Sequence, residues 1–247
     1  MILISFMIVK NKKILGIIPA RGGSKGIPGK NIKNFNGWPL IYWTIDPALK
    51  SGILSRIIVS TDDDEIAGVA KSFGAEVPFK RPTELSGDKS PTLLTVIHAV
   101  DYLHKNENYY PDFILLLEPT FPGRKPQQIK EAIDLILATG ADSVISLVEV
   151  PSKYNPAWQF EVTNSGRTKI ITGTDFKKII TRRQDISKTY IRNGAIYLFR
   201  TDLLFGSEPS FYGKDIRAYI MDPVYNLDID TMEDWFFAES KIASILK

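Results

Sequence analysis

The sequence predicts an α/β fold built on a doubly wound, mainly parallel sheet. Two observations lead to this prediction. Short apolar runs alternate with segments of helical periodicity along most of the chain, as in repeated strand–helix units. The first apolar run passes directly into a glycine-rich loop, and sheets of this kind bind ligands where such loops leave the strands. The 247 residues suit one such domain with a small insertion.

Short apolar segments predict the strands. Several are followed directly by acidic or turn-forming residues, which marks the end of each strand. We expect strands at residues 14–19, 56–60, 113–117, 143–148, 193–199 and 217–221.

Helices are predicted between and after these strands. One helix follows the acidic run 62–65, because Ile66, Ala70 and Phe73 share a face and Gly74 is placed to end it. Thr231 and Asp234 fit a capping box that opens the last helix. The other helices are expected at residues 40–50 (with Pro47 disturbing the middle), 91–104, 127–139 and 233–245.

The pattern changes between residues 151 and 192, which contain alternating residues, a turn at 164–166 and a basic stretch, but no strong helix. This predicts a β-rich insertion. We therefore expect a core domain made of residues 12–150 and 193–247, interrupted by the insertion 151–192. Residues 1–11 are expected to be an N-terminal extension, either frayed or added as an edge strand.

Composition excludes several classes of protein. A net charge of +3 is too small to favour a nucleic-acid partner, and the chain has no cysteine for disulfides or thiolate metal sites. Residues 1–9 are apolar but too short to span a bilayer and lack signal-peptide features, so we expect a cytoplasmic protein with no membrane partner. No Ser–His–Asp arrangement suggests a covalent hydrolase.

The loop at residues 20–31 predicts a cradle for a polyphosphate. Residues 17–31 hold four glycines, three cations (Arg21, Lys25 and Lys30) and no acid. Closely spaced backbone N–H groups of a glycine-rich turn form an anion-binding concavity, and the cations add charge. Ser24 stands where a Walker loop needs its first glycine, and the dinucleotide fingerprint is broken as well. The alternative is an ordinary solvated turn.

Asp228 and Asp230 are the best candidates for a metal site. In an extended segment both carboxylates lie on one side while Ile229 points into the core. Two nearby carboxylates suit Mg²⁺, which keeps several waters and bridges to substrate phosphates. The alternative is a solvated loop whose acids favour the start of the following helix.

The glycine-rich loop resembles the opening of the CTP site in the acylneuraminate cytidylyltransferases, the CMP-sialic acid (CMP-nonulosonate) synthetases. Their pattern A-R-x-x-S-K-G-x-x-x-K-N is matched from Ala20 to Asn31. Further segments resemble the family in the same order, at residues 57–62, 81–85, 118–124, 193–197 and 228–231. The resemblance implies a Rossmann-like nucleotidyltransferase that transfers CMP from CTP to the anomeric hydroxyl of a nonulosonic acid and releases pyrophosphate.

The resemblance also implies roles for individual residues. Arg21 and Lys30 would act with Asp228 and Asp230 in catalysis, the two aspartates holding Mg²⁺. The nucleotide would be bound by Ala20, Arg21, Gly22, Gly23, Lys30, Asn31, Arg81, Ser90 and Thr92. The acidic nine-carbon sugar would be bound by Glu118, Asn193, Tyr197 and, across a homodimer formed by the insertion, Arg183.

Several alternatives stay open. Lys25 either shares the phosphate role or points into solvent, Arg81 is otherwise a surface cation, and Asp88 either resembles another family acid or braces its own loop. Glu118 replaces a glutamine, and Trp158 a basic residue, of the sialic acid members, so the acceptor is open. The alternatives are the same reaction on legionaminic acid, pseudaminic acid or Kdo, or a catalytically silent nucleotide-binding subunit with a regulatory role.

Overall fold

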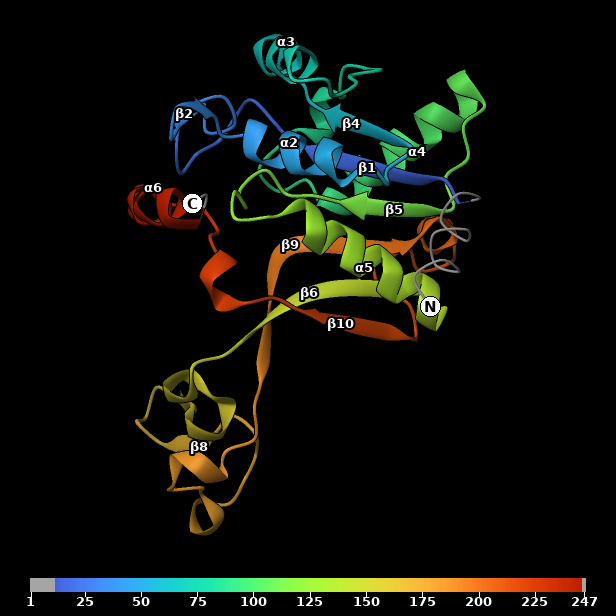
Figure 1. The fold of residues 1–247 in the computed structure, drawn as a ribbon. Helices are drawn as coiled ribbons and strands as arrows, with labels where there is room; N and C mark the ends of the chain where they lie inside the picture. The colour runs from blue at the N-terminus through green and yellow to red at the C-terminus, as the bar shows by residue number, and fades with distance from the viewer. Residues whose placement is uncertain (1–11, 246–247) are drawn as a thin grey trace.

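The computed structural model describes residues 12–245, so our expectation for residues 1–11 lies outside the described residues. A six-stranded sheet forms the centre of the molecule, with strand order β10-β6-β9-β5-β1-β4 (Figure 1). The strands are β1 (Ile14–Pro19), β4 (Arg56–Ser60), β5 (Phe113–Leu116), β6 (Ser143–Glu149), β9 (Tyr190–Arg200) and β10 (Ile216–Ile220).

The sheet is mainly parallel, as the sequence predicts. β1 pairs in parallel with β4 and β5, and β10 pairs in parallel with β6. β9 runs antiparallel to both β5 and β6 and joins the two parallel groups. β9 begins three residues earlier than expected, and a register shift interrupts its pairing with β6 between Ile145 and Leu147.

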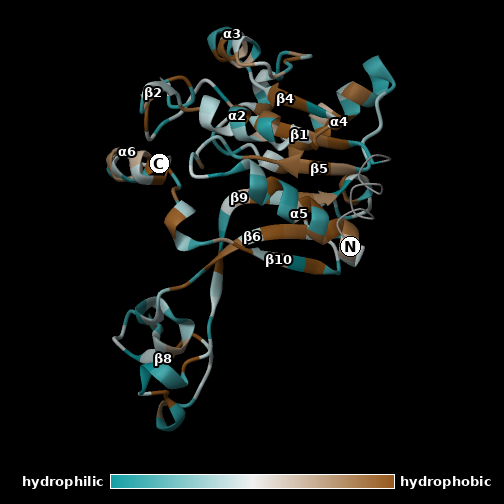
Figure 2. Ribbon diagram, in the orientation of Figure 1, coloured by the Kyte–Doolittle hydropathy of each residue, from teal (hydrophilic) through white to brown (hydrophobic). Residues whose placement is uncertain are grey.

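Helices cover both faces of the sheet. They are α2 (Tyr42–Ser51), α3 (Asp64–Ser72), α4 (Thr92–Glu107), α5 (Pro126–Thr139) and α6 (Met232–Ile245). Side chains of β1 alternate between two cores: Ile14 and Ile18 pack in the cluster that includes α2 and α5, while Leu15 and Ile17 pack in the cluster that includes α4. Figure 2 shows the hydrophobic residues concentrated in the central strands.

The helix ends follow local chemistry. The Asp63 side chain accepts hydrogen bonds from the N–H groups of Glu65 and Ile66 at the start of α3. The capping box before α6 is confirmed, because Thr231 N donates to Asp234 Oδ2 (2.8 Å) and Asp234 N donates to Thr231 Oγ1 (3.2 Å). The expected disturbance at Pro47 is wrong: α2 continues through this residue, whose ring is buried.

Residues 150–189 leave the sheet between β6 and β9 and extend away from the body of the molecule (Figure 1). We call this segment the excursion. It contains only one small antiparallel pair, β7 (Phe160–Val162) with β8 (Thr168–Ile170). The rest is loop and short 3₁₀ turns, η2 (Ser152–Tyr154), η3 (Pro156–Trp158), η4 (Phe176–Lys178) and η5 (Arg183–Asp185). It is therefore less regular than the β-rich insertion we expect from its alternating residues.

The remaining short elements lie in the connections. They are β2 (Asn34–Phe35), β3 (Trp38–Pro39), η1 (Thr83–Leu85), η6 (Thr201–Leu204) and η7 (Pro223–Tyr225). None of the helices described between residues 12 and 245 combines the length and apolarity needed to cross a membrane. The parallel strands β1, β4 and β5 end at one edge of the sheet, and the loops that follow them build the site described next.

Candidate functional site

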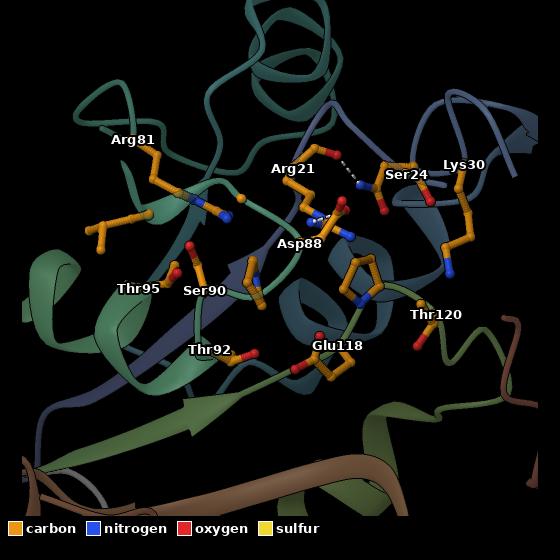
Figure 3. Close-up of a pocket in the computed structure, with 15 residues that line it drawn as sticks. Arg21, Ser24, Lys30, Arg81, Asp88, Ser90, Thr92, Thr95, Glu118 and Thr120 are labelled. Carbon is orange, nitrogen blue, oxygen red and sulfur yellow. Dashed lines mark hydrogen bonds and ion pairs between the residues drawn. The ribbon is translucent and has the colours of Figure 1, made fainter. Parts of the chain in front are cut away.

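A polar cavity of about 260 Å³ opens where β1 and β5 end (Figure 3). Three chain segments, residues 19–31, 81–95 and 118–120, contribute its walls. The lining residues are Pro19, Arg21, Ser24, Lys30, Asn31, Arg81, Leu85, Gly87, Asp88, Ser90, Thr92, Thr95, Glu118, Pro119 and Thr120. The cations and hydroxyl groups among them suit a charged, oxygen-rich ligand.

Contacts with other parts of the chain hold the loop at residues 20–31 at several points, although much of its backbone is exposed. Ala20 is fully buried, and its N–H donates to the Ser60 carbonyl of β4 (2.9 Å). Asn31 Nδ2 holds the Arg21 carbonyl (2.9 Å). The N–H of Gly22 donates to Asp62 Oδ1 (3.1 Å), so this predicted phosphate donor is already engaged. Gly23 has open space around its α-carbon.

Lys30 connects this loop to the segment that carries the late aspartates. Its side chain is buried, and Nζ donates to the Ile229 carbonyl (2.7 Å) and lies 3.4 Å from Asp230 Oδ1. Gly26 lies so close to the same segment that a Cβ there would be 2.4 Å from the Asp230 carbonyl oxygen. The loop and the segment that holds the two aspartates are therefore in direct contact, and Lys30 lines the cavity while Asp228 and Asp230 are not among its lining residues.

Asp228 and Asp230 flank a fully buried Ile229, as the alternation predicts. Both carboxylates are open to solvent. The Asp228 carboxylate nevertheless lies in a concave region, where surrounding protein raises its pKa and the charge of Asp230 raises it further, against a hydrogen bond from Thr120. Repulsion between the two carboxylates favours a cation beside them.

This donor set fits Mg²⁺. Carboxylate oxygens are the hard ligands this ion prefers, and it retains waters and phosphate oxygens. Across residues 12–245 no three His, Cys, Asp or Glu side chains converge on a metal position. Asp228 and Asp230 would thus supply part of the coordination and leave the rest to water and a phosphate-bearing ligand.

Glu118 lies where β5 ends and lines the cavity. Burial raises its pKa to about 7, the charge of Asp228 adds to the effect, and Arg124, Arg81 and Lys30 oppose it. Within the described part of the chain no group donates a hydrogen bond to its carboxylate. The nearby Arg124 is buried, but its guanidinium donates to other acceptors. These are the carbonyls of Ala195 (2.7 Å) and Glu118 (3.0 Å) and the hydroxyl of Thr44 (3.1 Å). Glu118 can therefore offer its carboxyl group to a ligand.

Arg81 is buried rather than a surface cation. Its Nε donates to Ser60 Oγ (3.1 Å) and its guanidinium also bonds the Ser60 carbonyl. Burial lowers its pKa to about 10, which leaves it charged at neutral pH. Ser90, whose Oγ donates to the Glu84 carbonyl (3.0 Å), and Thr92, the first residue of α4, line the same cavity.

The predicted sugar-binding residues are less concentrated. Tyr197 of β9 is half-buried, and its pKa is raised chiefly by burial and also by the charges of Glu118 and Asp228 across the cleft. Asn193, however, is held inside the sheet, where it accepts from Ser146 Oγ (2.6 Å) and donates to Met221 Sδ (3.3 Å). Its amide is thus engaged where the pairing of β6 with β9 is irregular, and its role in sugar binding stays a prediction.

Two residues of the excursion lie outside this cavity. Arg183 is exposed in η5, with Nε donating to Ser152 Oγ (3.1 Å). Trp158 is anchored within the excursion by its Nε1, which bonds the Ile180 carbonyl. A role for Arg183 in the site thus depends on a second subunit and stays a prediction.

Sequence reasoning missed three residues of the site. Thr120 donates to Asp228, and its place two residues after Glu118 could have signalled it. Arg124 donates a hydrogen bond to the Glu118 carbonyl (3.0 Å), but its position in the sequence does not predict a buried cation. Arg192 bonds the hydroxyl group of Tyr212 (3.3 Å) and that of Tyr197, which puts a cation beside Tyr197 on β9.

Comparison with known proteins gives the chain its family. The Cytidylyltransferase family profile matches residues 15–245. CMP-N,N'-diacetyllegionaminic acid synthase of Legionella pneumophila is 35% identical, over 92% of this chain and 95% of that protein. Pseudaminic acid cytidylyltransferase of Campylobacter jejuni is 34% identical, over 92% and 95%. N-acylneuraminate cytidylyltransferase A of Danio rerio is 37% identical over 94% of this chain, which spans 51% of that longer protein.

Solved structures share the fold at low sequence identity. CMP:2-keto-3-deoxy-manno-octonic acid synthetase complexed with CTP superposes with a TM-score of 0.67 at 18% identity, covering 94% of this chain and 99% of that chain. A 4-diphosphocytidyl-2C-methyl-D-erythritol synthase from Anaerococcus prevotii gives a TM-score of 0.66 at 13% identity, covering 96% and 99%. These likenesses confirm the predicted Rossmann-like α/β fold.

The approach of Gly26 to the Asp230 carbonyl predicts a selective loss of stability. Gly26→Ala should lower the free energy of unfolding by about 1–3 kcal/mol, because the new methyl group displaces one segment from the other. Gly23→Ala is the matched control and should change it by less than about 0.5 kcal/mol, since nothing surrounds that position. Urea unfolding measures both. Equal values for the two variants would contradict the close contact.

The raised pKa of Glu118 predicts a pH-dependent difference in stability. Between pH 4.5 and about 7 the folded protein keeps a proton that the unfolded chain releases, so stability falls as pH rises through this range. The side chain of Glu118→Gln cannot ionise. Relative to the wild type, the free energy of unfolding of this variant should therefore increase between pH 5 and pH 8, by up to about 3 kcal/mol. Urea unfolding at both pH values measures the gain. Parallel pH profiles would show that Glu118 titrates normally.

Proposed function

This chain belongs to the cytidylyltransferase family, and on that premise we propose that it is a CMP-nonulosonate synthetase. It would transfer CMP from CTP to the anomeric hydroxyl of a nine-carbon acidic sugar and release pyrophosphate. The observation that carries this proposal is the direct contact, through Lys30, between the cationic loop at residues 20–31 and the segment that holds Asp228 and Asp230.

The nucleotide fits the half of the cleft built by β1, β4 and the start of α4. Arg21, Lys25 and Lys30 place positive charge where a triphosphate would lie, because all three belong to the loop after β1. The buried Arg81 beside Ser90 and Thr92 offers donors for the acceptor edge of cytosine. The loop supplies affinity for phosphate, and Arg81 with Ser90 and Thr92 supplies selectivity for the base.

The reaction is an in-line displacement at the α-phosphorus. The anomeric hydroxyl passes its proton to the ionised form of Glu118 or to water as its oxygen forms a bond to this phosphorus, while the bond to the bridging oxygen of the β-phosphate breaks and pyrophosphate leaves. Arg21 and Lys30 stabilise the negative charge that develops on the leaving group. When bound at Asp228 and Asp230, Mg²⁺ would neutralise charge at the reacting phosphate. Glu118, with a pKa of about 7, stands between the two halves of the cleft and can hold or release a proton there.

The acceptor sugar fits the side of the cleft formed by the ends of β5 and β9. Glu118 offers a hydrogen-bonding carboxyl group, Tyr197 a phenol and Arg192 a cation for the sugar carboxylate. Relatives named for legionaminic, pseudaminic and N-acylneuraminic acids match at 33–37% identity, so this likeness does not select one acceptor. Legionaminic or pseudaminic acid is the alternative to sialic acid.

We also propose a cytoplasmic homodimer in which the excursion covers the cleft of a second copy. Apolar side chains of the excursion are exposed in the single chain, among them Tyr154 (56%), Val162 (66%) and Phe176 (49%). Association would bury this surface and bring the partner subunit's Arg183 to the sugar.

The direct test is a pyrophosphate-release assay with CTP and a panel of nonulosonic acids and Kdo. We expect CTP-dependent and magnesium-dependent turnover with at least one nonulosonic acid, and much slower turnover with Kdo. Asp230→Asn should lower turnover by about two orders of magnitude while circular dichroism and the melting temperature stay near those of the wild type. Asp202→Asn, at an exposed ion pair with Arg200, is the control. Full activity of Asp230→Asn would show that Asp230 is not a metal ligand.

The homodimer makes a separate prediction for Arg183. Arg183→Ala should raise the KM for the sugar about tenfold, the loss of one charged hydrogen bond, while CTP affinity stays within about twofold. Its neighbour Arg182, paired with Asp185, provides the control variant Arg182→Ala. Steady-state kinetics with each substrate varied in turn separate the two effects. An equal loss for CTP and sugar would argue against a role of Arg183 at the partner's sugar site.

A further inference from the structure

Two of the three cations in the loop at residues 20–31 are paired with a carboxylate of the same chain. The Asp88 carboxylate lies 2.9 Å from Arg21 Nη1 and 2.5 Å from Lys25 Nζ, and both cations depress its pKa, Lys25 more strongly than Arg21. Figure 3 shows Asp88 against Arg21 inside the cavity. The third cation, Lys30, is directed to Ile229 and Asp230 instead. A carboxylate thus sits where the loop would otherwise meet a phosphate.

Asp88 belongs to a short exposed tip that can move without disturbing the core. Gly87, Asp88 and Lys89 are all exposed. Local bonds fix the base of the tip, where Ser86 Oγ donates to the Pro82 carbonyl (3.1 Å) and Ser90 Oγ donates to the Glu84 carbonyl (3.0 Å). For residues 87–89, the two ion pairs of Asp88 are the only side-chain links to another element in the described part of the chain. Release of Asp88 therefore breaks two partly exposed ion pairs and little else.

We propose that Asp88 is an internal competitor for the phosphate tail: it neutralises Arg21 and Lys25 in the free protein, is displaced when a triphosphate enters, and returns to both cations as pyrophosphate leaves. This inference rests on the proposed function, because it needs a ligand whose phosphates reach the loop. A triphosphate carries several negative charges and outcompetes a single carboxylate. Once its bond to the nucleotide is broken, pyrophosphate is held by the loop alone. The nearby Asp88 carboxylate can then displace it by pairing again with Arg21 and Lys25.

The competing role differs from that of a structural brace in the direction of its effect. A brace that holds Arg21 and Lys25 in place improves ligand binding, so its removal weakens affinity. A competitor lowers affinity, so its removal strengthens binding. Partly exposed ion pairs are weak, and the expected change is therefore a moderate one.

The experiment is calorimetric titration of the full-length protein with pyrophosphate, CTP and CMP. Asp88→Asn should bind pyrophosphate and CTP about three- to tenfold more tightly than the wild type, since two exposed pairs no longer compete. CMP, which lacks the outer phosphates, should bind with affinity unchanged within about twofold. The gain should shrink as salt is raised, because screening weakens the competing pairs. Product inhibition by pyrophosphate should become stronger by the same factor.

Two further variants complete the design. Asp64→Asn removes an exposed acid that pairs with Lys80 (2.7 Å) outside the cavity lining and controls for the change in net charge; it should leave all three affinities within about twofold. Asp88→Glu keeps the carboxylate and should stay close to the wild type.

The outcomes separate the two proposals. Unchanged or weaker pyrophosphate binding by a folded Asp88→Asn protein would overturn the competitor and leave the proposed function intact. Equal gains in Asp64→Asn would also overturn it, by assigning the effect to net charge. A wild-type protein that binds neither CTP nor pyrophosphate would overturn the proposed function, and the competitor with it.

Discussion

The buried ammonium group of Lys30 is the interaction on which the site depends. Removing a cation from water is costly unless hydrogen-bonding and charged partners replace the solvent. Lys30 finds them in the Ile229 carbonyl at 2.7 Å and in the Asp230 carboxylate at 3.4 Å. Because these partners come from the segment before α6, satisfying one lysine brings the first loop of the fold against its last. Direct contact between the cationic loop and the segment of Asp228 and Asp230 is the geometric result.

Much of the fold and part of the site could be predicted because their signals are local. Strand and helix positions follow from periodicity, and the mainly parallel sheet follows from their alternation. The loop at residues 20–31 and the pair Asp228 and Asp230 stand next to buried apolar residues, which fixes where their backbones lie. The contacts of Lys30 and Gly26 show that these two segments lie against each other.

The parts that could not be predicted depend on contacts distant in sequence. The role of Asn193 comes from its hydrogen bond to Ser146, which no spacing rule reveals. The pKa of Glu118 depends on burial and on four charged neighbours from other segments. Asp88 could be assigned to Arg21 and Lys25 only when the loop before α4 was seen to fold over the loop after β1. The excursion lacks a core of its own, so alternation alone overstates its strand content.

The contact between Lys30 and Ile229 spans 199 residues and so has a consequence for biogenesis. Contacts of such high order form late in folding, because a long loop must close first. During synthesis the strands β1, β4 and β5 emerge and can assemble long before the segment around residue 229 leaves the ribosome. A nascent chain therefore carries the cationic loop without its facing carboxylates, and competence for turnover arrives only after the segment around residue 229 has been made.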